Sequence, residues 1–541
     1  MCSSDLKLRE LSKFGVVTDV SSFNLPPQAW TYAKNCRFKS GSIERGPVLR
    51  RIPVTLSNTE PRYIQANTPT SGFDTIYIGY LDGTIYELAS QVETDVSISG
   101  YTPADSDTNW TGCQLGGVNY INRPDRVPWF KTTAASDFAT LTNWTGTWRA
   151  NILRSCNSVL CAFGITKGSN VYPTMIKTSS IGYTGTVPAS WDETDPTQNA
   201  YENTLSDMQG GITEAQTLGN NMIVYGYNEA WMMQPVTSTD IWQVHRIFND
   251  AGCINANCAV EVEGKHFVFG PTDIYMHDGS SKKSISDSVV RRHIFDNLDA
   301  SKTNRCFVVY DRARREVRFN YVSGDEYLDF ATGGGCNRCA VYYVPEGTWT
   351  FDDLPYIYSG TVANIDQTET WATIQPTWDE SGSTWLDLDS GLRKSVLLLG
   401  EVDVAAGVSA SVYAVDNQYT GSIIPYAVDD NATRPALLER GGIDLDELPN
   451  VKKLEGYKTL SSIWPQGVFE PDSTLEFAVG GADNYNDEPD LGDAQEYDGS
   501  TYKRCDFNTA GRYVRIRITQ PSHLWFKLTA LDLDLYATGE H

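Results

Sequence analysis

The residue types that most often carry chemistry are sparse, and their spacing fits no complete metal-binding motif. Cys336 and Cys339 form a Cys-x-x-Cys pair after a glycine triplet, which could supply half of a structural zinc site. Such a site needs four ligands, and no second Cys-x-x-Cys or paired histidine supplies the rest. Cys253 and Cys258 are too far apart in sequence to complete a familiar pattern. We therefore expect no metal site at these cysteines.

The segment 482–498 has seven carboxylates and no basic residue, and carboxylate oxygens are the ligands that calcium prefers. The segment lacks the D-x-[DN]-x-[DN]-G-x5-E spacing of a calcium-binding loop. A solvated hairpin tip is the simpler interpretation, and calcium binding stays open. The candidate ligands are Asp483, Asp487, Glu488, Asp490 and Asp493.

No catalytic signature is present. The six histidines do not occur as H-E-x-x-H, and no G-x-S-x-G, Walker or Rossmann motif is found. His266 lies in an apolar run, Gly264–Gly270, where we expect a hydrogen-bonded core imidazole. Gly382–Trp385 is similar to the end of a sialidase Asp-box, but Glu380 and Trp378 stand where that motif has Asp and Ser. We predict a protein that is not an enzyme, with no catalytic, cofactor-binding or metal-binding residues.

Charge and composition exclude several classes of protein. The 541 residues include 43 basic and 68 acidic ones, a net charge of −25. This balance argues against non-specific nucleic-acid binding and against docking on anionic membranes, because both depend on lysine and arginine. No apolar run is long enough for a membrane helix, and the first fifteen residues lack the apolar core of a secretory signal. The eleven scattered cysteines indicate reduced, mostly buried thiols.

The elements that must position any functional residues are short β-strands. The chain has 62 aromatic residues beside 44 glycines and 24 prolines, which is typical of strands separated by turns. Two runs of alternating apolar and polar residues are joined by a turn at Asp82-Gly83, which predicts a β-hairpin. The same pattern recurs at Asp278-Gly279. The best helix candidate is Ser286–Leu298, with Ser286 or Asp287 as its cap.

These patterns predict an all-β chain, a β-propeller with an appended C-terminal β-sandwich and few short helices. Hairpin units recur over residues 53–425, which we assign to the propeller. Residues 426–541 form the sandwich. Residues 1–52 form a basic arm and hairpin with a net charge of +5, which either docks on an acidic surface or forms a solvated edge strand.

Two segments near the N-terminus are distinctive, Phe14–Trp30 and Asn35–Arg45. They resemble the opening of the tail nozzle, or tail tubular protein B, family of short-tailed bacteriophages. The resemblance consists of short sequence segments rather than a catalytic signature, and it covers most of the chain. Further similar phrases are Thr184–Asp195, Leu218–Gly226, Phe248–Asn257, Gly264–Gly279, Leu437–Arg440 and Thr529–Asp534.

The resemblance implies a structural virion protein. Members of that family are described as β-propeller subunits that form a six-fold ring around the DNA-ejection channel at the distal end of the tail. The implied partners are further copies of the chain in a homohexamer, the tail adaptor protein, the tail fibres, and genomic DNA that passes without specific binding. No membrane insertion is implied, and the implied location is the phage tail, after assembly in the host bacterial cytoplasm.

Two other functions fit the same composition. A propeller rich in carboxylates could bind or hydrolyse glycans, which requires two carboxylates about 5–10 Å apart beside a cleft. A receptor-binding tail tip would instead expose an aromatic patch on its outer face. For the nozzle, we expect carboxylates to face the channel, because walls of the same sign as DNA repel it.

Overall fold

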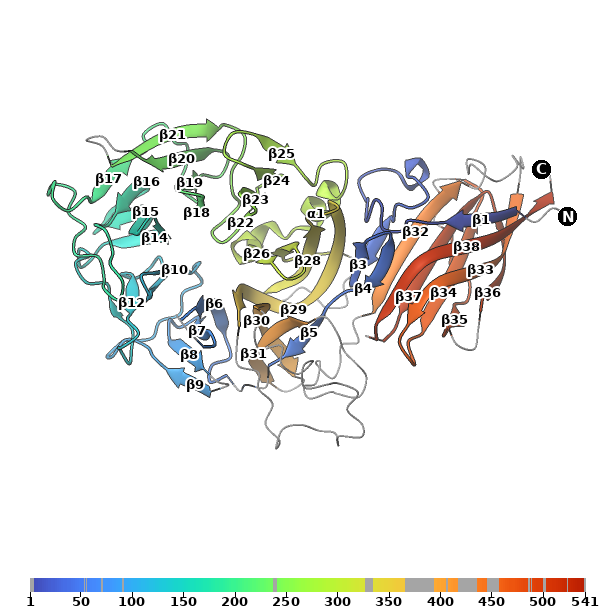
Figure 1. The fold of residues 1–541 in the computed structure, drawn as a ribbon, viewed down its shortest axis with the longest axis horizontal. Coiled ribbons are helices and arrows are strands. Elements are labelled where there is room, and N and C mark those ends of the chain that lie inside the picture. Colours follow the sequence, from blue (N-terminus) through green and yellow to red (C-terminus); the bar gives the residue numbers. More distant parts are fainter. Residues whose placement is uncertain are drawn as a thin grey trace.

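The computed structural model describes residues 4–52, 54, 56–69, 72–89, 92–236, 241–325, 334–364, 394–404, 407–416, 435–444, 457–484, 487, 489–499, 503–522 and 524–539. Within these ranges the regular secondary structure is almost wholly β-strand, and the strands form a ring of small sheets beside a two-layered body (Figure 1). The prediction of a β-propeller with an appended β-sandwich is confirmed.

Five blades of the propeller are consecutive four-stranded antiparallel meanders, each paired in chain order. Blade 1 contains β6 (Pro61–Asn67), β7 (Thr75–Tyr80), β8 (Ile85–Ala89) and β9 (Val92–Asp95). Blade 2 contains β10 (Thr111–Leu115), β11 (Val118–Asn122), β12 (Trp129–Lys131) and β13 (Ala139–Thr140). Blade 3 contains β14 (Arg149–Cys156), β15 (Val159–Lys167), β16 (Asn170–Thr178) and β17 (Tyr201–Thr204). Blade 4 contains β18 (Glu214–Leu218), β19 (Asn221–Tyr225), β20 (Ala230–Pro235) and β21 (Trp242–Phe248). Blade 5 contains β22 (Ala259–Val262), β23 (Lys265–Phe269), β24 (Ile274–His277) and β25 (Lys282–Ser284).

Two further blades share one long strand, which gives seven blades among the described residues. The sixth contains β26 (Phe307–Asp311), β27 (Glu316–Tyr321), β28 (Cys336–Tyr343) and the first half of β29 (Thr348–Ala363). In the seventh, the second half of β29 pairs with β30 (Ser395–Val404), followed by β31 (Gly407–Asp416) and β5 (Val48–Arg51). The outermost strand of the last blade therefore comes from the N-terminal segment.

The two predicted hairpins at Asp-Gly are confirmed, although only their glycines have positive φ, +89° at Gly83 and +90° at Gly279. The aspartates act through their side chains instead. Asp82 Oδ1 accepts the backbone N–H of Thr84 at 2.9 Å, and Asp278 Oδ1 accepts that of Ser280 at 2.9 Å. Hydrogen bonds from the backbone N–H groups of Ser281 and Ser280 lower the pKa of Asp278.

The sandwich packs two sheets face to face. One sheet has the order β3 (Cys36–Lys39), β4 (Ser42–Arg45), β38 (Phe526–Gly539), β33 (Tyr457–Phe469), β36 (Cys505–Gly511), with β1 (Ser4–Leu8) also paired to β38. The other has the order β32 (Ala436–Asp444), β37 (Tyr513–Gln520), β34 (Leu475–Ala482), β35 (Gln495–Tyr497). Leucines alternating along β38, such as Leu531 and Leu533, fill the space between the sheets.

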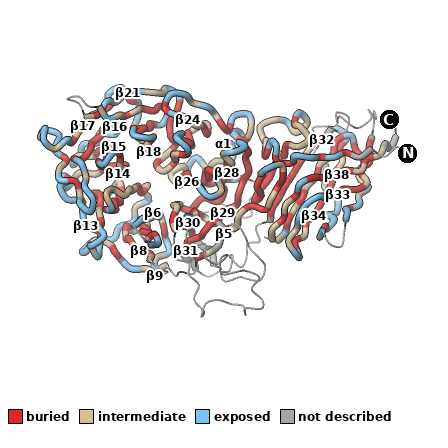
Figure 2. The backbone as a smooth tube through the Cα atoms, viewed as in Figure 1, coloured by how far each residue is buried: buried red, intermediate tan, exposed pale blue. Residues whose placement is uncertain are grey.

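The N-terminal segment belongs to both bodies. Its strands β1, β3 and β4 lie in the sandwich, and β5 lies in the propeller. Between them, β2 (Tyr32–Lys34) pairs parallel with β29 and antiparallel with β32, which joins a propeller blade and a sandwich layer into one sheet. The apolar core is continuous across this joint, as the buried positions in Figure 2 show.

The helical content is small, as expected. Among the described residues, α1 spans Arg291–Asn297, and two 3-10 turns are found, η1 (Ser22–Asn24) and η2 (Ala300–Arg305). α1 is shorter than the predicted helix, and neither Ser286 nor Asp287 caps it. The carboxylate of Asp19 accepts the N–H groups of Arg292 and His293 instead, so a residue distant in sequence satisfies the first turn.

Candidate functional site

The innermost strands of the blades meet around the propeller axis, and their inner edges have no further strand to pair with. Unpaired backbone groups in such a place need partners, because a buried carbonyl without a hydrogen bond is costly. Side chains from neighbouring blades supply them. Gln65 donates to the carbonyl of Cys113 at 3.3 Å, and Ser155 donates to that of Gln114 at 3.2 Å.

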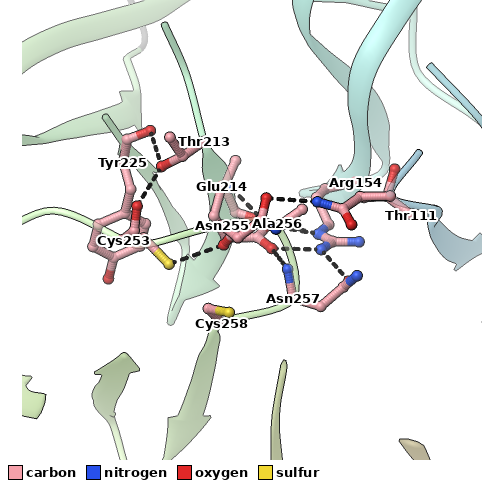
Figure 3. A network of polar contacts seen from close by, with 12 residues as sticks. Thr111, Arg154, Thr213, Glu214, Tyr225, Cys253, Asn255, Ala256, Asn257 and Cys258 are labelled. Atoms are coloured by element: carbon pink, nitrogen blue, oxygen red, sulfur yellow. Dashed lines mark hydrogen bonds and ion pairs between the residues drawn. The ribbon is translucent and has the colours of Figure 1, made fainter. Parts of the chain in front are cut away.

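An ion pair between blades 3 and 4 is the centre of this polar network (Figure 3). Arg154 of β14 contacts both carboxylate oxygens of Glu214 of β18, through Nε at 3.0 Å and Nη2 at 2.8 Å. The Glu214 side chain is 1 % exposed and that of Arg154 is 12 % exposed. Burial disfavours the charge of Arg154, but the adjacent carboxylate outweighs burial and raises the pKa of the guanidinium.

Asn257, just before β22, connects blade 5 to the Arg154–Glu214 ion pair. Its side-chain oxygen accepts from Arg154 Nη2 at 2.9 Å, and its amide nitrogen donates to the carbonyl of Trp110 at 2.9 Å. Its backbone N–H also donates to Glu214. Asn257 adopts a φ of +62°, a conformation that asparagine tolerates better than most residues. One side chain therefore links blades 2, 3 and 5.

The linker between blades 1 and 2 crosses this end of the propeller. Asn109 donates to the side chain of Asn255 at 2.5 Å, and Asn255 donates to the carbonyl of Thr303 at 3.2 Å. Asp107 binds Arg305 at 2.7 Å. The end of the axis is thus spanned by side chains from the linker and from blades 5 and 6, and these contacts fasten blades together.

A second buried network lies between blades 4 and 5. Tyr225 Oη is 2.6 Å from both His266 Nδ1 and His277 Nε2. His277 Nδ1 accepts the N–H of Gly279, and His266 Nε2 lies 2.7 Å from the carbonyl of Thr217. This pattern fixes both rings as neutral, with Tyr225 donating to His266 and accepting from His277. The expectation of a satisfied core imidazole at His266 is confirmed.

Burial explains why these imidazoles stay neutral. It lowers the pKa of His266 to about 4 and, together with the neighbouring His266 ring, lowers that of His277 to about 3. Burial likewise raises the pKa of Tyr225 well above its ordinary value. At neutral pH the three side chains therefore form a polar but uncharged link between the two blades.

The joint to the sandwich contains a third network, which is ionic and fully buried. Arg37 of β3 binds Asp352 of β29 through two bonds of 2.7 and 2.6 Å, and its Nε contacts Glu316 of β27 at 3.0 Å. Arg318 also contacts Asp352, at 3.0 Å. Burial opposes the charge on Asp352, but the two arginines hold its pKa at about 2.

The same network extends along the joint. Lys34 of β2 contacts Asp353 at 3.1 Å, and Arg338 of β28 bridges Asp353 and Asp325. His293 of α1 contacts Asp325 at 3.1 Å. The basic N-terminal segment therefore docks on acidic residues of its own chain, which is one of the two alternatives that its charge predicted.

The sequence candidates for metal binding do not come together. All ten described cysteines are unpaired, which confirms the expected thiols, and the described ranges contain no group of three His, Cys, Asp or Glu side chains placed to hold a metal ion. Cys336 and Cys339 are buried on β28, where Cys336 donates to the carbonyl of Arg305 and burial raises the pKa of Cys339 to about 12.

The acidic segment connects β34 and β35, at the surface. Asp483, Asp487, Asp490 and Asp493 are exposed there, and Asn484 donates to Asp487 at 3.1 Å. Glu488 lies outside the described residues, as do the Asp-box-like positions Trp378, Glu380 and Gly382–Trp385.

Sequence reasoning missed Arg154 and Glu214, which lie 60 residues apart on separate strands. Isolated charged residues at the ends of strand-like runs are common, so neither position stands out from its neighbours. Asn255 and Asn257 do fall within the phrase Phe248–Asn257 that carries the family resemblance. That phrase was the available signal for this site.

No protein-family model and no curated protein matches the chain. A solved structure described as "YCF48 bound to D1 peptide" is similar over 70 % of this chain and 97 % of that one, at 9 % sequence identity and a TM-score of 0.35. In addition, none of the described helices has the length and apolar character needed to cross a membrane.

Proposed function

We propose that this protein is a structural component of a virion, a tail nozzle or closely related tail-tube protein. It would form a ring around the DNA-ejection channel of a short-tailed phage, contacting the adaptor and the fibres. The observation that carries the proposal is that three of the family-like segments come together in the two sheets of the sandwich, which adjoins the propeller. Asn35–Arg45 forms β3 and β4, Leu437–Arg440 lies in β32, and Thr529–Asp534 lies in β38.

The stiffness of that joint supports a mechanical role. A strand shared between the two bodies, a continuous apolar core and a buried ionic network all oppose a change in the angle between them. A ring subunit must transmit force between its neighbours without bending. A hinge between two independently packed bodies would serve such a subunit poorly.

The propeller centre also bears on where DNA would pass. Side chains of the linker and of blades 5 and 6 span one end of the axis, so the channel in this proposal lies between copies of the chain. The net charge of −25 would keep the channel wall from holding phosphates by counterion release. A strongly basic channel in an assembled ring would contradict this part of the proposal.

The glycan-hydrolysing alternative has less support at the propeller centre. That chemistry needs two carboxylates with room for a sugar between them. The two carboxylates of the central network, Glu214 and Asp107, are each bound to an arginine. Both contacts fasten blades to one another.

The experiment is negative-stain imaging of the purified protein together with mass photometry. We expect closed rings whose mass is near six times the 60.0 kDa of one chain. Antibodies against the protein should label the distal end of the tail on intact virions. A protein that stays monomeric and is absent from purified virions would refute the proposal, and release of reducing sugar from host polysaccharide would favour the hydrolase.

A further inference from the structure

One end of the propeller centre carries a cationic cluster with the composition of a carboxylate-binding site. Arg62 of β6 and Arg305 of η2 both lie over the ring of Tyr358 of β29, with guanidinium carbons 4.4 and 5.0 Å from the ring centroid. Stacking on an aromatic ring orients the planar guanidinium and leaves its N–H edge available to a carboxylate. We name these three residues the arginine clamp.

Asp107, from the linker between blades 1 and 2, occupies the clamp. Arg305 Nη2 lies 2.7 Å from its carboxylate and Arg62 Nε lies 3.5 Å from it. Arg62 also contacts Glu60, at 4.0 Å. The two arginine side chains are only 9 % and 15 % exposed, whereas that of Asp107 is 50 % exposed. The arginines are therefore fixed in the wall of the propeller, and the anion approaches from the solvent side.

The segment that delivers Asp107 has little structure of its own. Residues 101–110 contain no helix or strand, and residues 102–105 are exposed. The segment is tethered on both sides of Asp107. The N–H groups of Ala104 and Ser106 donate to the carbonyls of Asp82 and Leu81 at 3.0 and 3.2 Å, and Asn109 donates to Asn255 at 2.5 Å. Half-exposed ion pairs contribute little free energy, because solvent screens them. A carboxylate on another peptide can therefore compete with Asp107.

We propose that the arginine clamp binds an acidic peptide segment of another protein, and that Asp107 holds the site in the free chain. The ligand is an extended peptide whose aspartate or glutamate replaces Asp107 against Arg62 and Arg305. This inference does not rest on the nozzle proposal, because the clamp lies within a single chain and its occupancy can be measured on the monomer.

The test measures binding of a labelled nonapeptide with the sequence of residues 103–111 to the full chain by fluorescence anisotropy. The substitution Asp107→Ala removes the internal competitor, so we expect the variant to bind the peptide about three- to ten-fold more tightly than the unchanged chain. Adding Arg62→Gln and Arg305→Gln to this variant should abolish binding. The same peptide with asparagine at position 107 should not bind.

Two matched substitutions separate the clamp from general charge effects. Asp105→Ala removes an exposed carboxylate from the same linker, and Arg126→Gln removes a partly exposed arginine that also lies over a tyrosine, at 5.7 Å from Tyr101. Neither should change the affinity. The inference fails if the peptide binds no variant, if Asp107→Ala does not tighten binding, or if the clamp substitutions leave binding intact while near-UV circular dichroism shows a folded chain.

Discussion

At the scale of single residues, the polar side chains at the propeller centre hold the blades together. Arg154, Glu214 and Asn257 come from three blades and satisfy one another and the backbone between them. Removing one partner of a buried pair is more harmful than never having the pair, because the remaining charge is left without compensation. Substituting Glu214 tests this role.

Glu214→Gln should destabilise the chain by about 3–5 kcal/mol, because the largely buried guanidinium of Arg154 would lose its counter-charge. The measurement is urea denaturation followed by tryptophan fluorescence. Glu263→Gln is the control, since Glu263 pairs with Arg315 at 2.8 Å on the surface, and it should leave the free energy of unfolding nearly unchanged. Equal effects of the two substitutions would show that the central pair is unimportant.

The histidine link predicts a loss of stability in mild acid. The folded pKa values of His266 and His277, about 4 and about 3, lie below the ordinary value of 6.5, so the unfolded chain binds more protons between these limits. The free energy of unfolding should therefore be highest above pH 6.5 and should fall as the pH drops toward 4, by roughly 1.4 kcal/mol per imidazole for each pH unit.

The double substitution His266→Gln, His277→Gln should flatten this pH dependence, and His245→Gln, on the exposed part of β21, should leave it unchanged. Asp352 affects the free energy of unfolding only at a lower pH. Its depressed pKa of about 2 means that its stabilising contribution is complete above pH 3.8 and is lost only as the pH falls toward 2. An unfolding free energy that is constant from pH 7 to pH 4.5 would contradict the histidine account.

At the scale of elements, the N-terminal segment is what makes two bodies into one. β2 completes the sheet that crosses the joint, β5 completes the last blade, and Lys34 and Arg37 neutralise Asp353 and Asp352. A basic arm that only clamped a neighbouring subunit would be dispensable for folding of the single chain. The observed pairing excludes that role for the part of the segment that forms strands.

Deleting residues 1–52 should therefore prevent the chain from folding, since it exposes a strand edge and leaves buried carboxylates without their cations. Circular dichroism and limited proteolysis would show an unfolded or aggregated product. Deleting residues 1–8, which removes only β1 from the sandwich, should cost far less and leave the propeller intact. A soluble, protease-resistant product of the longer deletion would refute this account.

At the scale of the whole molecule, propeller and sandwich should unfold together. One cluster of buried residues extends from blades 4 to 6 into the sandwich, and one sheet runs through both bodies. We expect a single calorimetric transition for the unchanged chain. The double substitution Asp352→Asn, Asp353→Asn should split it into two, because Arg37 and Arg338 would each keep only one of their two carboxylate partners in the buried joint. Two transitions in the unchanged chain would show that the bodies are independent.

The sequence by itself determined the local elements. Alternation of apolar and polar residues, glycine turns such as Gly83 and Gly279, and the absence of long helical patterns all act over a few residues, so the all-β propeller with its sandwich could be predicted. The neutral, hydrogen-bonded state of His266 was predictable for the same reason, because its neighbours in the run Gly264–Gly270 are apolar.

Only the tertiary structure decided which distant residues meet. The pairing of Arg154 with Glu214, the capping of α1 by Asp19, and the placement of Asp107 between Arg62 and Arg305 each join segments between 45 and about 270 positions apart. Such contacts depend on how blades close into a ring and on which strand joins two sheets. The charge of a segment predicts the sign of the charge on the surface it contacts, as it did for the N-terminal segment. Which residues form that surface is determined by the tertiary structure.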